Sequence, residues 1–155
     1  MLGHLARYLR AAGYDTTLAS GGTRDRDLLA QARVEHRVFL TCDRRIAEHN
    51  AAREVAIILP RGGLDDTAGA VSRALDIHWL HAPFTRCIVD NTPLGAVPEA
   101  LRGALPSDVK TRSPRFCPRC KRVYWAGSHT ARMQRRLASW SSGHFAHAPS
   151  NEASL

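Results

Sequence analysis

The sequence predicts an α/β domain with a mostly parallel sheet, followed by a small module that is not held together by a large core. Two short apolar runs, VFLT (38–41) and VAIIL (55–59), have the composition of buried strands and are separated by a helical pattern. After about residue 83 the composition changes, because most of the prolines and three of the four cysteines lie beyond that point. Long helices are therefore expected only before it.

The predicted elements of the first part alternate between helix and strand. Leu2, Leu5, Ala6 and Leu9 recur at helical spacing. Gly13 has the character of a helix C-cap, and the short extended piece YDTTLA follows it. The remaining predicted elements are a helix that begins near Asp25, the strand 38–41, a short helix over 44–52, the strand 55–59 and a helix over 64–75. This βαβ rhythm predicts helices flanking a parallel sheet.

We therefore expect three regions. Residues 1–83 form the α/β domain, residues 84–133 form the cysteine-containing module, and residues 134–155 are a polar, aperiodic tail that we expect to be disordered.

The chain is strongly basic. Its 155 residues include 22 Lys and Arg but only 14 Asp and Glu, which gives a net charge of +8. A charge of this sign favours a polyanionic partner, most simply RNA or DNA, although a basic protein without such a partner has the same composition. No apolar run is long enough to span a membrane, and the amino terminus lacks the pattern of a secretory signal, so we expect an intracellular, cytoplasmic protein with no membrane partner.

Acidic residues stand at the predicted carboxyl edge of the sheet. Asp43 follows the strand VFLT, and Asp25 opens the preceding helix. Two carboxylates that converge there can hold Mg²⁺ or Mn²⁺, while Arg44 and Arg45 bind phosphates nearby. The alternative is that both acids are only helix N-caps, each contributing about 1 kcal/mol. Asp27 is expected to be a solvated acid in the first helical turn.

The second constellation is a cysteine pattern, C-x2-D-x26-C-x2-C, formed by Cys87, Asp90, Cys117 and Cys120. Three thiolates and a carboxylate can bind Zn²⁺ tetrahedrally. His129 or His81 could instead be the fourth ligand, or the site could have lost its metal.

Cations and aromatic residues surround the second cysteine pair. Arg119 and Arg122 are candidates for binding nucleic acid, and Tyr124 and Trp125 either stack on bases or form the core of the module.

Together, "MLGHLARYLRAAGYDT", "RDRDLLAQA", "RVFLTCDRRIA", "PFTRCIVDNTPL" and "FCPRCKRVYWAGSH" resemble the PIN-like ribonuclease family named for the carboxy-terminal region of the exonuclease Mut-seven. The resemblance covers residues 1 to about 133. It implies a PIN-like α/β domain followed by a zinc ribbon, acting as a divalent-metal-dependent RNase. Asp25 matches the acid of the D-x-x-L helix, and Asp43 matches the acid of the L-T-x-D-R motif. Cys87, Cys117 and Cys120 match zinc ligands.

Two departures from the family pattern accompany the resemblance. Asp90 stands where the family has a cysteine. The family also has a strand that ends in an Asp before the segment that begins here at Met1, so we expect either a longer natural protein or a truncated, weakly active one. The leading hypothesis is hydrolysis of RNA phosphodiesters with Asp25 and Asp43 as metal ligands. The alternative is a non-catalytic RNA- or DNA-binding protein with a degenerate PIN-like site.

Overall fold

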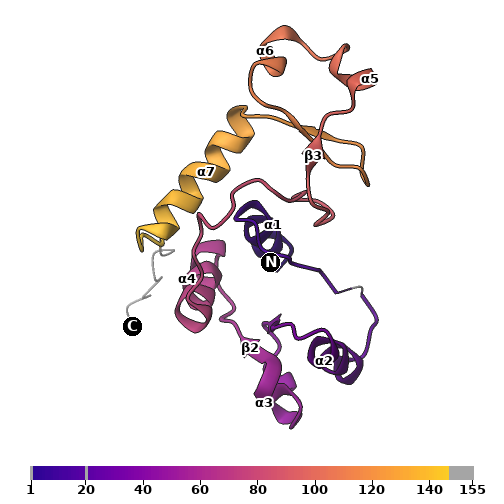
Figure 1. The fold of residues 1–155 in the computed structure, drawn as a ribbon. Helices are drawn as coiled ribbons and strands as arrows, with labels where there is room; N and C mark the ends of the chain where they lie inside the picture. The colour runs from indigo at the N-terminus through magenta and orange to yellow at the C-terminus, as the bar shows by residue number, and fades with distance from the viewer. Residues whose placement is uncertain (1, 20, 147–155) are drawn as a thin grey trace. The chain divides into compact units, whose positions relative to one another are not determined.

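The computed structural model describes residues 2–19 and 21–146, and they divide between two compact units (Figure 1). The first unit contains residues 18–77 and the second contains residues 3–17 and 78–144. Helix α1 (Leu2–Ala11), which we assigned to the α/β domain from the sequence, therefore clusters almost entirely with the cysteine-containing part of the chain.

The first unit is a small mixed α/β assembly. Its elements are α2 (Asp25–Val34), β1 (Phe39–Thr41), the 3₁₀ helix η1 (Arg44–Glu48), α3 (Ala52–Val55), β2 (Ala56–Ile58) and α4 (Leu64–Leu75). Strands β1 and β2 are parallel, with Phe39 opposite Ala56 and Thr41 opposite Ile58. The backbone N–H of Leu59 donates to the carbonyl of Thr41 at 2.7 Å and extends this pairing. The predicted parallel arrangement of the two apolar runs is confirmed.

The core of this unit lies between the sheet and the helices α2, η1 and α3. Leu29 from α2, Ile46 from η1 and Ala52 from α3 are buried together, and Phe39 and Ile58 from the two strands pack against them. The predicted single helix over 44–52 is instead two short helices, because the backbone of His49 is extended and interrupts the helical hydrogen bonding.

The second unit combines α1 with the carboxy-terminal half of the chain. Its further elements are β3 (Gly95–Ala96), α5 (Glu99–Arg102), α6 (Ser107–Lys110), β4 (Arg115–Phe116), β5 (Val123–Tyr124) and α7 (Ser128–Ser141). The three strands form an antiparallel sheet in the order β3-β4-β5. Each of these strands is only two residues long.

Helix α7 corrects two expectations: it is a 14-residue helix beyond residue 83, where no long helix was expected, and it occupies part of the expected disordered tail. Residues 134–141 are helical, because Met133, Leu137 and Trp140 recur at helical spacing and are buried on one face. The ring of Trp140 lies 4.9 Å from that of Tyr8 and 4.7 Å from that of Trp79. Residues 147–155 of the expected tail lie outside the described part of the chain. Within that part, no helix is long and apolar enough to cross a membrane.

Candidate metal centre and acidic sheet edge

The first half of the candidate metal centre is a tight turn from Cys87 to Asp90. The N–H of Asn91 donates to the carbonyl of Cys87 at 2.9 Å, and the N–H of Cys87 donates to the carbonyl of Thr92 at 2.8 Å. Asn91 has a left-handed backbone with φ of +73°. The Oδ1 atom of Asp90 accepts a hydrogen bond from the N–H of Thr92 at 3.0 Å, which fixes the carboxylate.

The second half repeats this turn thirty residues later. The N–H of Lys121 donates to the carbonyl of Cys117 at 3.0 Å, and the N–H of Cys117 donates to the carbonyl of Arg122 at 2.9 Å. Lys121 is also left-handed, with φ of +62°. Asp90 therefore occupies in the first turn the position that Cys120 occupies in the second.

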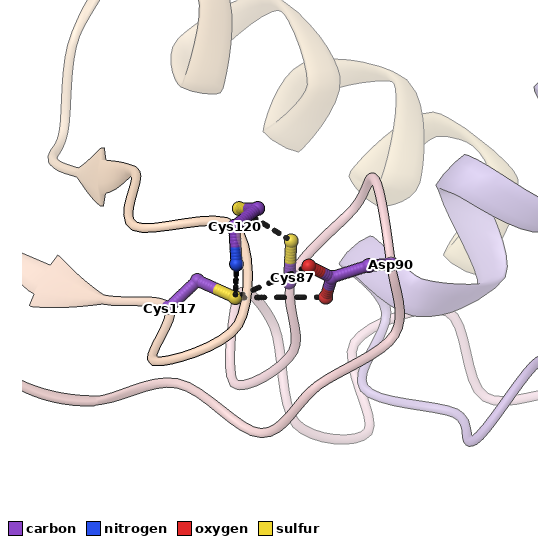
Figure 2. A group of neighbouring side chains, drawn as sticks. All are labelled: Cys87, Asp90, Cys117 and Cys120. Carbon is purple, nitrogen blue, oxygen red and sulfur yellow. Dashed lines mark hydrogen bonds between the residues drawn. The ribbon is translucent and has the colours of Figure 1, made fainter.

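The two turns bring all four predicted zinc ligands together (Figure 2). The donor atoms of Cys87, Asp90, Cys117 and Cys120 lie within 4.8 Å of one another. The Sγ atoms of Cys87 and Cys120 are 3.7 Å apart, and the Cys117 thiol lies 3.5 and 3.4 Å from the two Asp90 oxygens. A tetrahedral zinc with Zn–S bonds of about 2.3 Å places its sulfur ligands roughly 3.8 Å apart, so this donor set can hold a metal ion such as zinc.

The fourth donor in this group is Asp90, not a histidine. Among the described residues, this is the only group of three or more His, Cys, Asp or Glu side chains whose donor atoms converge, and neither His129 nor His81 belongs to it. The ring of His81 instead stacks on Tyr14, with the centroids 5.2 Å apart.

Burial and hydrogen bonding set the charges in this centre. Burial raises the pKa of the Cys87 thiol to about 11, although a hydrogen bond with Tyr124 opposes the rise. Burial also acts to raise the pKa of Asp90, but hydrogen bonds from the Thr92 N–H and from the Cys87 and Cys117 thiols outweigh it and hold the pKa below its ordinary value. Asp90 is therefore a carboxylate, the form that binds a metal.

The two aromatic residues that follow the second turn have different surroundings. The Tyr124 hydroxyl lies 3.0 Å from the Cys87 Sγ, and burial together with this hydrogen bond raises the pKa of Tyr124. Tyr124 thus packs on the metal centre, whereas Trp125 is 42% exposed. Tyr124 therefore belongs to the core of the module, whereas the exposed ring of Trp125 is accessible for stacking on a base.

Arg10 braces the first turn, and our reading of the sequence missed it. Arg10 is buried in α1, its Nε donates to the carbonyl of Thr16 at 2.7 Å, and its Nη1 donates to the carbonyls of Ile88 and Val89 at 3.3 and 2.8 Å. Ile88 and Val89 are the two residues between the candidate metal ligands Cys87 and Asp90. Burial lowers the pKa of Arg10, and the nearby Cys87 and Asp90 oppose that shift. The sequence did contain a signal for this role, because Arg10 lies one helical turn after Ala6 and so places a cation on the apolar face of the helix.

The segment after α1 adds a second brace. The Nδ2 atom of Asn91 donates to the Asp15 carboxylate at 2.7 Å, and the Oδ1 atom of Asn91 accepts from the N–H of Thr16 at 3.0 Å. The Nη1 atom of Arg86 donates to the carbonyl of Asn91 at 3.0 Å, and its Nη2 lies 3.7 Å from Asp15. The first turn is therefore held by protein contacts around the candidate metal ligands Cys87 and Asp90.

Asp43 lies just beyond the carboxyl end of β1, as the sequence predicted. It is the N-cap of η1, and its Oδ1 accepts a hydrogen bond from the N–H of Arg45 at 2.9 Å. Its own N–H donates to the hydroxyl of Thr41 at 3.0 Å. The capping role is confirmed, and the exposed carboxylate retains a second oxygen that makes no hydrogen bond with a described residue.

Asp25 is the first residue of α2 and does not cap it, because the N-cap position belongs to Arg24. Helix α2 leads through a short turn into β1, and Leu29 of α2 belongs to the same core cluster as Phe39 of β1. The Asp27 carboxylate forms ion pairs with the Nε atoms of Arg24 and Arg26, at 2.8 and 3.4 Å. In the described residues, no group of three or more acidic, histidine or cysteine donors forms at this edge.

The predicted substrate-binding cations are all exposed. Arg44 and Arg45 lie on η1 beside Asp43, and Arg119 and Arg122 lie in and next to the second cysteine turn. None of these four side chains forms an ion pair with an acid in the described part of the chain, so their charge remains accessible to an anion.

The chain thus combines a mixed α/β unit with a module whose three cysteines and one aspartate could hold a metal ion. The family model described as the Mut7-C RNAse domain matches residues 1–137, and the chain belongs to this family. No curated protein and no solved structure matches the chain significantly. Membership indicates a ribonuclease-like function and a nucleic-acid substrate, as the resemblance in the sequence implied.

Proposed function

We propose that this protein is a divalent-metal-dependent ribonuclease that hydrolyses RNA phosphodiester bonds. The observation that carries the proposal is membership of an RNase family across residues 1–137, a span that includes both Asp25 and Asp43. The parallel β1–β2 pair supports a PIN-like arrangement of the first unit, and Asp43 stands at the strand end where α/β folds bind ligands.

Asp25 and Asp43 are the proposed ligands of Mg²⁺ or Mn²⁺, because hard divalent cations prefer carboxylate oxygens. A bound cation of this kind supplies an activated water and stabilises charge on a phosphodiester. Arg44 and Arg45 orient the scissile phosphate and keep their charge near it during the reaction. In the hydrolysis, the water oxygen bonds to phosphorus and gives up a proton, while the P–O3′ bond breaks and the leaving oxygen takes up a proton; the products are a 3′ hydroxyl and a 5′ phosphate.

The cysteine module has a structural and a binding role in this proposal. Zn²⁺ held by Cys87, Asp90, Cys117 and Cys120 fixes both turns, and Arg119 and Arg122 contact RNA phosphates while Trp125 stacks on a base. The four free cysteines suit a reducing compartment, and we place the protein in the cytoplasm.

The alternative is an RNA- or DNA-binding protein that does not cleave. Two observations favour it: among the described residues no group of three or more metal-binding side chains contains Asp25 or Asp43, and Asp43 already caps η1. This alternative predicts salt-sensitive binding without metal-dependent cleavage.

The test is cleavage of end-labelled single-stranded RNA by the full chain in Mn²⁺, Mg²⁺ or EDTA, beside Asp25→Asn and Asp43→Asn. The proposal expects cleavage that requires a divalent ion and both aspartates. RNA that is bound but left intact under every metal condition supports the non-catalytic alternative.

A further inference from the structure

The segment between the two cysteine turns forms a basic pocket that neither the metal centre nor the acidic edge uses. The pocket has a volume of about 550 Å³, within the range of roughly 300–1,000 Å³ that is typical of ligand sites. Its walls come from β3, α5, α6 and the start of β4. These elements follow one another along the chain, and Figure 1 shows α5 and α6 in the segment that follows β3.

Three cations line this pocket, and no carboxylate does. They are Arg102, Lys110 and Arg115, and the hydroxyl of Ser113 adds a neutral donor. A concave surface with several cations and donors suits a tetrahedral oxyanion, such as a phosphate group, better than it suits an apolar ligand.

The charges in the pocket are not neutralised by their neighbours. Arg115 has no ion pair or side-chain hydrogen bond with a described residue. The Nε of Arg102 lies 3.9 Å from the Glu99 carboxylate, an exposed pair at the limit of an ion pair, which contributes little. The Nζ of Lys110 donates to the carbonyl of Gly103 at 3.0 Å, and this bond orients the ammonium group while leaving two N–H groups for a ligand.

We propose that this pocket binds a phosphate group of an RNA strand and thus provides a phosphate anchor in addition to the acidic edge and the second cysteine turn. The inference rests on the proposed RNA partner, but it requires no catalysis. The ligand is an internal phosphodiester of single-stranded RNA, which brings a negative charge for each nucleotide to the cations that line the pocket.

Ala96 offers a sharp test because it is exposed in β3 and lines the pocket. Ala96→Glu places a carboxylate among the three cations, and Ala96→Gln has nearly the same shape without the charge. Arg115→Ala removes one cation, and Arg135→Ala on α7 is its matched control, since Arg135 is exposed and lies outside the pocket. Each variant is first checked for an unchanged far-ultraviolet circular dichroism spectrum and unfolding temperature.

Binding of a fluorescein-labelled oligouridylate to the full, zinc-loaded chain is measured by anisotropy in Mg²⁺- and Mn²⁺-free buffer at several salt concentrations. We expect Ala96→Glu to weaken binding about threefold or more relative to Ala96→Gln. We also expect Arg115→Ala to reduce the slope of log K against log salt by about 0.7, and by more than Arg135→Ala does.

Equal RNA affinity of Ala96→Glu and Ala96→Gln would overturn the inference. The inference would also be overturned if the pocket variants changed the binding of polyglutamate but not of RNA, because the pocket would then bind an acidic protein segment. If the pocket variants weaken binding but no metal condition yields cleavage, the phosphate anchor stands and the proposed ribonuclease activity fails. If cleavage is normal and the pocket variants have no effect, the anchor alone fails.

Discussion

Replacing Arg10 by methionine should destabilise the second unit and weaken its metal centre. Methionine keeps most of the volume but none of the three hydrogen bonds from Arg10 to the carbonyls of Thr16, Ile88 and Val89. The two short bonds, at 2.7 and 2.8 Å, are the main loss, and at about 1.5 kcal/mol each they amount to about 3 kcal/mol. For a chain of this size, that loss corresponds to a fall in unfolding temperature of roughly 6–12 °C.

The matched control for this change is Arg7→Met, because Arg7 is an exposed arginine on the same helix. Thermal unfolding followed by circular dichroism compares the two variants, and competition with a chromophoric chelator compares their zinc affinities. We expect Arg10→Met to lose about tenfold or more in zinc affinity, since the carbonyls it holds lie between two ligands. If the unfolding temperatures and zinc affinities of the two variants agree within error, Arg10 does not brace the first turn.

Three further predictions follow from the second unit. Asp90→Cys should bind zinc more tightly than the wild type and Asp90→Ala more weakly, because position 90 occupies the same place in its turn as Cys120 does in the second turn. Competition with a chromophoric chelator measures both zinc affinities. The reverse order of affinities would contradict the equivalence of the two turns. Gly13→Ala should lower the free energy of unfolding by about 2 kcal/mol or more in denaturant titrations. The reason is that Gly13 has φ of +102° and that a Cβ there would lie 2.5 Å from the carbonyl oxygen of Ala82. The control is Gly95→Ala, whose Cβ would meet no atom within 4 Å and which should change the stability little. Trp125→Ala should weaken RNA binding by about 1–3 kcal/mol with little change in the salt slope, and an unchanged affinity would remove Trp125 from the interface.

Local patterns predicted much of this molecule. The two apolar runs were placed correctly as a parallel pair, because a buried strand has a recognisable composition over a few residues. The cysteine spacing predicted that these four donor groups converge, and Asp90 was included because it keeps the three-residue interval from Cys87. Both inferences depend only on residues that are close in sequence or share a repeated spacing.

What the sequence did not reveal depends on long-range packing. Arg10 bonds to residues 78 and 79 positions away, and no local pattern identifies such partners. Helix α7 was missed because its stripe of Met133, Leu137 and Trp140 is sparse among polar residues, and because Trp140 packs on Tyr8 and Trp79, which are distant in sequence. The pocket near Arg115 likewise requires β3, α5 and α6 to fold around it.

Single-turnover RNA cleavage by Asp43→Asn in Mn²⁺ would show whether Asp43 binds a catalytic metal or only caps η1. Asparagine caps a helix about as well as aspartate but is a much poorer ligand for a hard cation, so this change separates the two roles. We expect this variant to keep the wild-type unfolding temperature and at least the wild-type RNA affinity in EDTA, and to lose nearly all Mn²⁺-dependent cleavage. A variant that cleaves RNA at the wild-type rate would show that Asp43 is only a cap.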